Sequence, residues 1–293
     1  MQDICRLLGF SVQAYHKKQK RTLQHLTKEQ IIIAQIDAIR KHQPRCGGRK
    51  LYIMLQPFLK QHCIVIGRDK FFLLLRKNKL LVRKTKRSVY TTDSKHFFYR
   101  YPNMIKDFTP LKAHELWVAD ITYVPLKNRF AYLFLITDAY SRKIVGHYVS
   151  DDMKVSSAII ALKKALDQKP VDSIVIHHSD RGMQYCSTAY VQLLQDHYAH
   201  VSMTQNGDPY ENAIAERVNG ILKSELLNRC YDTIDQAAAH INRSIIIYNY
   251  KRRHSSLNWQ IPGNVHKQHG PQIKRWKNYY QPLKKKEVSM QEP

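Results

Sequence analysis

Hydrophobic residues in the first part of the chain recur at the spacing of an α-helix. In residues 29–42, isoleucines at positions 32, 33, 36 and 39 fall on one helical face, and Pro44 with the glycines that follow ends the segment. Two shorter segments, residues 49–61 and 68–78, also read as helices. We therefore predict that residues 1–81 form a helical region.

The two shorter helices are separated by a connector at residues 63–67, which is typical of a helix-turn-helix. The second helix of such a unit reads DNA, so Arg68 and Lys70 at its start are candidate DNA contacts. A small helical bundle with a solvated basic face is the alternative interpretation. Residues 82–110 follow without helical periodicity, and we predict a linker there.

From about residue 111 the pattern changes to β-branched and aromatic runs with polar breaks. Three consecutive runs predict strands that pair antiparallel, and strands and helices alternate after them. The predicted strands are residues 116–124, 130–138, 143–150, 173–179 and 200–204, and the predicted helices are residues 155–168, 188–200, 211–229 and 233–250. This order predicts an α/β fold, with a mixed five-stranded sheet and flanking helices over residues 111–265. A basic tail is predicted over residues 266–293.

Charge is distributed unevenly along the chain, which carries 48 Lys and Arg residues against 23 Asp and Glu residues. Residues 1–100 hold 23 basic and 5 acidic side chains, whereas residues 101–250 hold 15 and 16. Residues 251–293 are basic again, with 10 and 2. A nearly neutral core between basic flanks favours a nucleic-acid-binding protein, although solvated helix faces produce the same composition.

Other features of the composition argue against several classes of protein. No apolar run approaches the roughly 20 residues of a membrane span, and no secretory signal opens the chain. We therefore expect a cytoplasmic protein with no membrane partner. The five cysteines are scattered and never spaced as Cys-x-x-Cys, so we expect neither a disulfide framework nor a structural zinc site.

Three carboxylates occupy unusual positions in the α/β part of the chain. Asp120 lies in the middle of an apolar strand, where an unpartnered charge costs several kcal/mol. Asp180 follows the fourth strand, at the sheet edge where sites of α/β proteins collect. Glu216 lies on a long helix, in line with Asn212 and Asn219, and this line faces away from the apolar stripe of the helix.

Each of these carboxylates has an ordinary explanation on its own, as a buried ion pair, a turn cap or a surface side chain. Together they suit hard divalent cations such as Mg²⁺, which take oxygen ligands and leave positions for water and phosphate. Two such ions held by three carboxylates can activate a water or a 3′-hydroxyl for in-line displacement at phosphorus. We therefore interpret Asp120, Asp180 and Glu216 as a candidate metal-binding and catalytic triad.

Several motifs around these carboxylates resemble those of a known family. Asp180 and Glu216 are separated by 35 residues, and Lys223 comes seven residues after Glu216. The matching segments read HSDRGMQY at residues 178–185, ENAIAE at residues 211–216 and YNYKRRHSSL at residues 248–257. Together they resemble the retroviral-integrase-like transposases of bacterial insertion sequences, above all the second-frame protein (OrfB) of the insertion-sequence-three family.

The resemblance implies an RNase H-like core in which Asp120, Asp180 and Glu216 bind Mg²⁺, for which Mn²⁺ can substitute. It implies a polynucleotidyl transferase of the bacterial nucleoid that cleaves 3′ ends and transfers strands, acting on terminal inverted repeats and on target DNA. It also implies a homo-oligomer of at least two chains, and it allows a first-frame (OrfA) partner. Lys223 would contact the DNA end, and Arg252 is a candidate for either a DNA contact or helix-end packing.

Two other functions stay open on the sequence. A non-catalytic DNA-binding regulator would keep the basic flanks, but it has no need of an aspartate inside a strand. A plain nuclease of the same fold would cut DNA without joining it. A strand-transfer assay separates these functions, because only a transposase, of the three, joins DNA ends.

Overall fold

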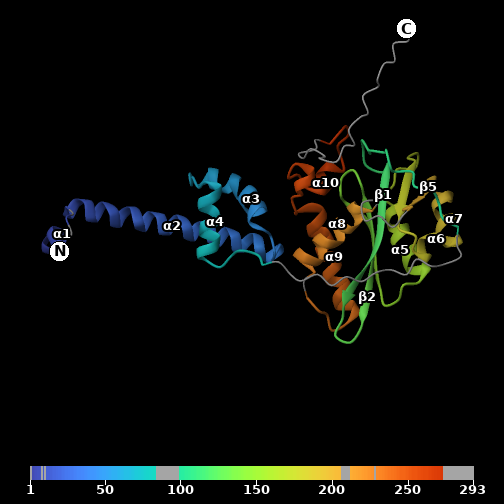
Figure 1. Cartoon of the computed structure of the whole chain (residues 1–293), viewed down its shortest axis with the longest axis horizontal. Coiled ribbons are helices and arrows are strands. Elements are labelled where there is room, and N and C mark those ends of the chain that lie inside the picture. Colours follow the sequence, from blue (N-terminus) through green and yellow to red (C-terminus); the bar gives the residue numbers. More distant parts are fainter. Residues whose placement is uncertain are drawn as a thin grey trace, which may run out of the picture.

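The structure is a computed structural model, and it describes residues 2–7, 9, 11–83, 99–205, 212–227 and 229–272. A helical region of residues 2–83 lies beside an α/β unit of residues 99–272 (Figure 1). The larger parts of the predicted linker and tail, residues 84–98 and 273–293, lie outside the described residues. Within the described residues, no helix has both the length and the apolarity that a membrane span requires.

The described residues of the helical region form four helices. They are α1 (Gln2–Leu7), α2 (Val12–His42), α3 (Gly48–Gln61) and α4 (Arg68–Lys77). The last three pack around a common core that includes the buried side chains of Ile36, Leu55 and Phe71. The bounds of α3 and α4 agree with the sequence prediction to within one residue.

Helix α2 begins at Val12 and not at residue 29 as predicted. Ser11 caps it, because its hydroxyl accepts a hydrogen bond of 3.1 Å from the backbone amide three residues later. Residues 13–28 are exposed, and this half of the helix extends away from the rest of the molecule (Figure 1). A helix with no buried face has no hydrophobic periodicity, so the sequence pattern revealed the half that buries Ile36.

In the described part of the α/β unit, five strands form one mixed sheet in the order β3-β2-β1-β4-β5. They are β1 (Leu116–Pro125), β2 (Phe130–Asp138), β3 (Ile144–Ser150), β4 (Val175–Ser179) and β5 (Ala199–Met203). β1 pairs antiparallel with β2, and β2 with β3, whereas β4 lies parallel to both β1 and β5. The mixed five-stranded sheet predicted from the sequence is confirmed.

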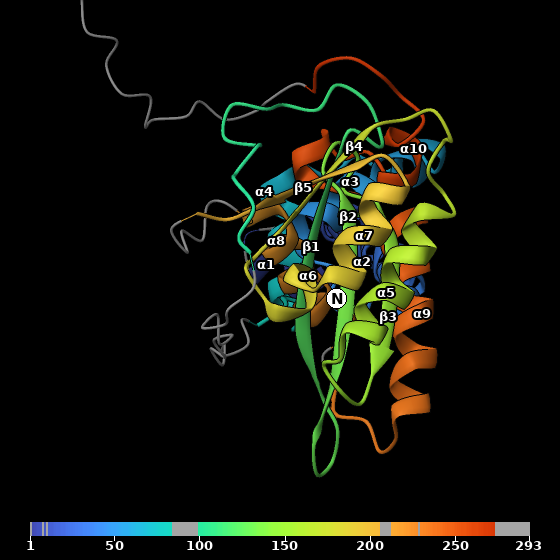
Figure 2. The ribbon, with the colours of Figure 1, turned by 90° about the vertical axis from the view of Figure 1, so that its right-hand side faces the viewer.

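Helices cover both faces of this sheet (Figures 1 and 2). One face carries α5 (Val155–Leu166), α6 (Met183–Cys186) and α7 (Thr188–Asp196). These helices enclose a core that includes Trp117 and Leu162. The opposite face carries α8 (Ala213–Ile221), the π-helical turn η1 (Leu222–Leu226) and α9 (Ile234–Tyr250). Their core includes Leu133 and Ile241, so the central strands are buried on both sides.

The helix predicted at residues 211–229 consists of two elements. α8 ends at Ile221, and η1 continues it with π-helical hydrogen bonding. A π-helical turn inserts one extra residue into a helix and is frequent at functional sites. The helix predicted at residues 233–250 is α9, which Thr233 caps by accepting a hydrogen bond of 3.3 Å from the Gln236 amide.

The described parts of the predicted linker and tail pack on the α/β unit. Met104 donates its backbone amide to the Ser202 hydroxyl at 2.9 Å. Two short helical turns, η2 (Ser255–Leu257) and α10 (Pro262–Val265), follow α9. Beyond them, the Gly270 amide donates to the Leu111 carbonyl at 2.7 Å. In the structure, the α/β unit therefore includes residues on both sides of the range 111–265.

Candidate active site

Asp120 and Asp180 come from neighbouring parallel strands. β1 and β4 pair in register up to Val118 opposite His178. The same register continued by two residues brings Asp120 opposite Asp180, which directly follows the end of β4. Parallel pairing therefore brings together two carboxylates that are far apart in the sequence.

Two hydrogen bonds hold the Asp120 carboxylate. Its Oδ2 accepts from the Asn219 side-chain amide at 2.5 Å, and its Oδ1 accepts from the Ile121 backbone amide at 2.9 Å. Burial raises the pKa of Asp120 to about 7; the negative charges of Asp180 and, more weakly, Glu216 add to this rise, and the two hydrogen bonds oppose it. The three predicted carboxylates therefore share one electrostatic environment.

Asp180 shapes the turn that follows β4. Its Oδ1 accepts a hydrogen bond of 3.0 Å from the Gly182 amide. A Cβ at position 182 would come within 3.0 Å of the same oxygen, so a glycine lets the turn close around the carboxylate. The neighbouring Arg181 donates its Nε to the Thr204 carbonyl at 2.6 Å, which joins the turn to the end of β5.

Two asparagines bond α8 to β1 and so place Glu216. The Asn212 side-chain amide donates to the Ala119 carbonyl at 3.0 Å, and Asn219 donates to Asp120. These asparagines are seven residues apart, which is about two helical turns, so they lie on the same face. Glu216 stands between them in the first turn of α8, with its side chain exposed.

Asn212, Glu216 and Asn219 were predicted to lie on the face of α8 opposite its apolar stripe, and the structure bonds the two asparagines of this face to β1. They are 7% and 5% exposed, because both amides bond to β1. The apolar residues of α8, such as Val218, belong to the core between this helix layer and the sheet. The supporting role of Asn219 was missed, although its spacing from Asn212 around Glu216 is visible in the sequence.

Lys223 lies on η1 with its side chain exposed, seven residues after Glu216. Partial burial lowers the pKa of its amine, and the negative charge of Asp120 acts in the opposite direction. The amine is therefore within electrostatic reach of Asp120. Its contact with a DNA end stays a prediction.

The chemistry of the donor set fits Mg²⁺. Asp120 and Asp180 offer oxygen ligands, and a bound divalent cation would oppose the burial and the carboxylate repulsion that raise the pKa of Asp120. Within the ranges that the structure describes, no three His, Cys, Asp or Glu side chains are gathered closely enough to hold a metal ion by themselves. Mg²⁺ usually binds through one or two carboxylates together with waters and substrate phosphates, so the aspartate pair is a sufficient protein contribution.

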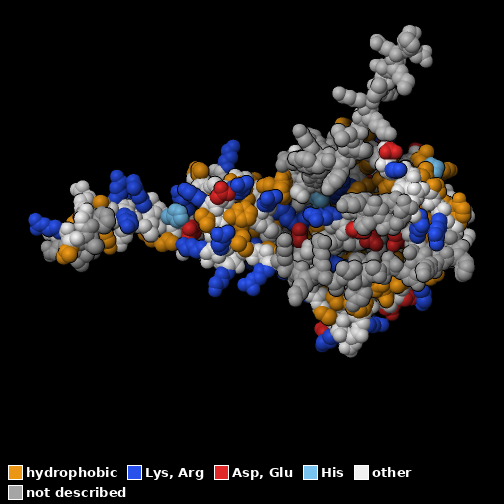
Figure 3. Space-filling view, in the orientation of Figure 1, with side chains coloured by type: hydrophobic (Ala, Val, Ile, Leu, Met, Phe, Trp, Pro, Cys, Tyr) orange, Lys and Arg blue, Asp and Glu red, His pale blue; other side chains and the backbone are white. Residues whose placement is uncertain are grey.

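The structure does not bring Arg68 and Lys70 to the carboxylates. Both are exposed at the start of α4, in the helical region. Arg68 pairs with Asp69 at 3.0 Å, with the two side chains 70% and 85% exposed, and such a surface pair has little energetic value. Lys and Arg side chains are spread over the helical region (Figure 3), and its role in DNA binding stays a prediction.

Arg252 packs inside the protein and does not fit a DNA contact. It is 5% exposed, and its guanidinium donates two hydrogen bonds of 2.9 Å to Glu225. A guanidinium enclosed in this way is not available to a phosphate. Of the two roles that the sequence left open for Arg252, the structure supports helix-end packing, which corrects its use as a DNA-binding candidate.

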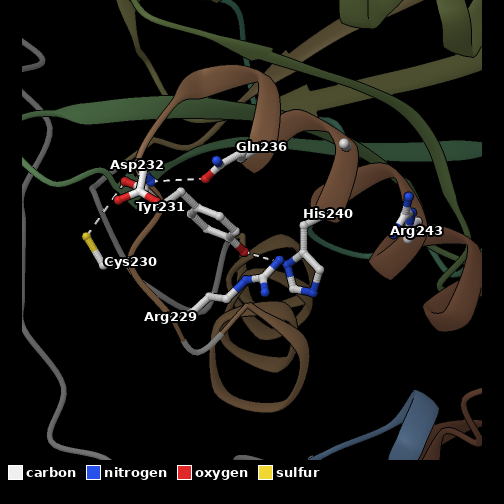
Figure 4. Close-up of a pocket in the computed structure, with 8 residues that line it drawn as sticks. Arg229, Cys230, Tyr231, Asp232, Gln236, His240 and Arg243 are labelled. Carbon is white, nitrogen blue, oxygen red and sulfur yellow. Dashed lines mark hydrogen bonds between the residues drawn. The ribbon is translucent and has the colours of Figure 1, made fainter.

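A separate surface pocket of about 400 Å³ lies at the start of α9 (Figure 4). Arg229, Tyr231, His240 and Arg243 are among its lining residues. The Tyr231 hydroxyl and the Nδ1 atom of His240 are 2.6 Å apart. None of the three predicted carboxylates lines this pocket, so it is distinct from the candidate active site.

Comparisons with known proteins point to one family. Two family models described as "Integrase core domain" match residues 110–209 and 198–262. The "Insertion element IS600 uncharacterized 31 kDa protein" of Shigella sonnei is 31% identical over 263 residues, which is 87% of this chain and 94% of that protein. The "Transposase InsF for insertion sequence IS3A" of Escherichia coli (strain K12) is 33% identical over 156 residues, which is 51% of this chain and 53% of that protein.

Among solved structures, the catalytic core domain of HTLV-2 integrase in complex with magnesium is similar, with 19% identity and a TM-score of 0.44. The match covers 54% of this chain and 99% of the viral one. The family assignment rests on the sequence relatives and the integrase core models. The chain belongs to the insertion-sequence-three family of transposases and has an integrase-like core.

Proposed function

We propose that this transposase cleaves DNA at the 3′ ends of an insertion sequence and transfers the freed strands to a second DNA site, with Mg²⁺ as its cofactor. The observation that carries the proposal is the closeness of the Asp120 and Asp180 carboxylates, whose charges interact, beside the helix that presents Glu216. A carboxylate whose pKa is raised inside an apolar strand costs folding energy that a neutral side chain would avoid. A role as a metal ligand accounts for that cost.

Asp120 and Asp180 would hold Mg²⁺, with Glu216 completing the set. When bound, Mg²⁺ supplies positive charge that activates a water or a 3′-hydroxyl and stabilises charge developing on the phosphate. The protein orients the ligands in advance, since Asn219 bonds to Asp120 and the Gly182 amide bonds to Asp180. Such support fixes the carboxylates before DNA arrives.

The proposed reaction consists of two displacements at phosphorus. In the first, water attacks a phosphodiester at the end of the element, the bond between phosphorus and the 3′-oxygen breaks, and a 3′-hydroxyl leaves. In the second, that hydroxyl attacks another phosphodiester, whose own 3′-oxygen leaves. One site can serve both steps without a covalent enzyme intermediate, because each step replaces one oxygen on phosphorus by another.

The proposed substrates are duplex terminal inverted repeats and duplex target DNA. Residues 1–100 carry 23 basic and 5 acidic side chains, which suits binding to the phosphate backbone of DNA. Such binding weakens as the salt concentration is raised. Exposed Arg68 and Lys70 on α4, and Lys223 beside the carboxylates, are the proposed contacts. Two ends must be held together for transfer, so we infer a homo-oligomer of at least two chains, with room for a first-frame partner.

A strand-transfer assay with Mg²⁺ and terminal-repeat DNA tests this proposal. The wild-type chain should yield cut and joined products, whereas Asp180→Asn should bind the DNA and yield neither. Asp172→Asn is the matched control. Asp172 is exposed and precedes β4, whereas Asp180 follows the other end of that strand. Cutting without joining by the wild type would indicate a plain nuclease, and binding without either reaction would indicate a regulator.

A further inference from the structure

A buried ionic cluster joins the helical region to the α/β unit. It consists of Lys50 on α3, Glu225 on η1 and Arg252 just after α9. Lys50 and Arg252 both donate to the Glu225 carboxylate, and Arg252 does so through two hydrogen bonds of 2.9 Å. Lys50 is 8% exposed and Arg252 is 5% exposed. Charges from three separate segments are therefore enclosed at one junction.

The charges of this ionic cluster shift the pKa values of Glu225 and Lys50. Burial alone would raise the pKa of Glu225, but the hydrogen bonds and charge of Arg252, together with Lys50, hold it below its ordinary value. Burial and the charge of Arg252 lower the pKa of Lys50, and Glu225 opposes that change. The adjacent Cys46 is buried, and its raised pKa keeps the thiol neutral. One carboxylate therefore serves two cations, and removing it would leave both without a counterion.

Glu225 lies on the same stretch of helix as the proposed catalytic glutamate. Glu216 on α8 and Glu225 on η1 are nine residues apart, and η1 starts at the residue after α8 ends. Asn219 bonds this stretch to Asp120 on β1, and Lys50 bonds its far end to α3. A displacement of α3 relative to the α/β unit would therefore act on the helix that carries Glu216.

We propose that Lys50 is a positioning residue for DNA cleavage, because its bond to Glu225 holds α3 and α4 in one orientation against the helix that carries Glu216. The inference rests on the proposed function, since the role that it assigns to Lys50 is a role in DNA cleavage. Figure 1 shows α3 between α4 and the α/β unit. DNA held on the helical region then reaches the carboxylates in one orientation. Correct orientation of a substrate increases the rate of a reaction by large factors.

Lys50 is the member of the ionic cluster that can be changed without breaking the α/β unit. Lys50→Met removes the bond to α3, whereas the pair between Glu225 and Arg252 stays, so no buried carboxylate loses its last partner. Methionine is of similar length and is a good helix former. Lys50→Arg keeps the charge and the reach. Lys60→Met is the matched control, since Lys60 is exposed in the last turn of the same helix.

The orientation of the two parts can be measured without any reaction. Cys63, after the end of α3, and Cys230, before α9, are exposed, whereas Cys46 and Cys186 are buried. In a full-length chain carrying Cys5→Ser, spin labels on the two exposed cysteines report the distance between the helical region and the α/β unit.

The wild type, Lys50→Arg and Lys60→Met should each give one narrow distance distribution, and Lys50→Met should give a broad one. An unchanged distribution in Lys50→Met would overturn the proposal. This measurement needs no DNA, so it decides on the orientation even if the chain proves to have a different activity.

Cleavage kinetics provide the second readout. At saturating terminal-repeat DNA, Lys50→Met should cut at least about tenfold more slowly than the wild type, because the DNA is no longer oriented on the carboxylates. Its affinity for the same DNA should stay close to that of the wild type, since Lys50 is buried. A fall in affinity together with an unchanged cleavage rate at saturating DNA would make Lys50 a DNA contact and overturn the proposal. Absence of cleavage by the wild type would instead refute the proposed function.

Discussion

The side-chain amide of Asn219 donates a hydrogen bond of 2.5 Å to the carboxylate of Asp120, which lies 99 positions earlier in the chain. Asn212 makes an equivalent bond of 3.0 Å to the Ala119 carbonyl. Glu216 stands between these two asparagines on α8. Amide hydrogen bonds to a strand, rather than apolar packing alone, therefore determine how the helix that carries Glu216 lies against β1.

Replacing Asn219 by alanine should destabilise the protein and impair cleavage. The buried carboxylate of Asp120 loses a donor, which should cost about 1–3 kcal/mol of unfolding free energy and raise its pKa further. Urea unfolding and the cleavage rate are the measurements. Gln195→Ala, at an exposed position on α7, is the control. Wild-type stability together with wild-type cleavage in Asn219→Ala would contradict the role given to this amide.

The burial of Asp120 should make stability depend on pH in a defined direction. Its pKa is about 7 in the folded chain, against about 3.9 for an unperturbed aspartate, so this carboxylate costs stability as the pH rises from about 4 through 7. In the presence of EDTA, Asp120→Asn should therefore stabilise the protein more at pH values above 7 than at pH values near 5. Urea unfolding of both proteins at the two pH values measures this, and an equal effect at both would refute the raised pKa.

Mg²⁺ should stabilise the wild-type chain in the absence of DNA. At a concentration ten times its dissociation constant, a ligand that binds the folded state alone adds about 1.4 kcal/mol. Thermal unfolding with and without MgCl₂ measures this, and KCl at the same ionic strength is the control. Asp180→Asn should lose the stabilisation, because one of the three proposed ligands is gone. Equal stabilisation of the two proteins would show that the ion acts elsewhere.

Asp138 should be needed for stability rather than for chemistry. It is fully buried and accepts hydrogen bonds from the His114 amide at 2.8 Å and from the Ser141 hydroxyl at 2.6 Å. Burial alone would raise its pKa, but these donors and the nearby His266 hold it below the usual value, so its contribution is lost as the pH falls through that lowered pKa. Asp138→Asn should cost about 2–4 kcal/mol of unfolding free energy.

The control for that substitution is Asp151→Asn, at an exposed position, which should change stability by less than about 0.5 kcal/mol. Both values come from urea unfolding at pH 7. A loss for Asp138→Asn no larger than that of the control would contradict the hydrogen-bond network around Asp138.

Local patterns in the sequence were sufficient for most of the secondary structure. The strands β1 and β2 and the helices α3 and α4 were predicted close to their observed bounds, because each buries residues at its own regular spacing. The exposed half of α2 escaped prediction, since a helix that buries nothing leaves no such spacing. The π-helical turn η1 was also missed, because an extra residue in a helix does not change which side chains are apolar.

Periodicity and composition are local properties of the chain, so they were sufficient to predict most of the helices and strands and the aspartate inside an apolar strand. The contacts between polar groups became visible only in the folded chain: Asn219 with Asp120, and Lys50 and Arg252 with Glu225. Those pairs depend on how distant elements cross and pair in register. The same arginine or asparagine is a surface group in one such arrangement and a buried partner in another.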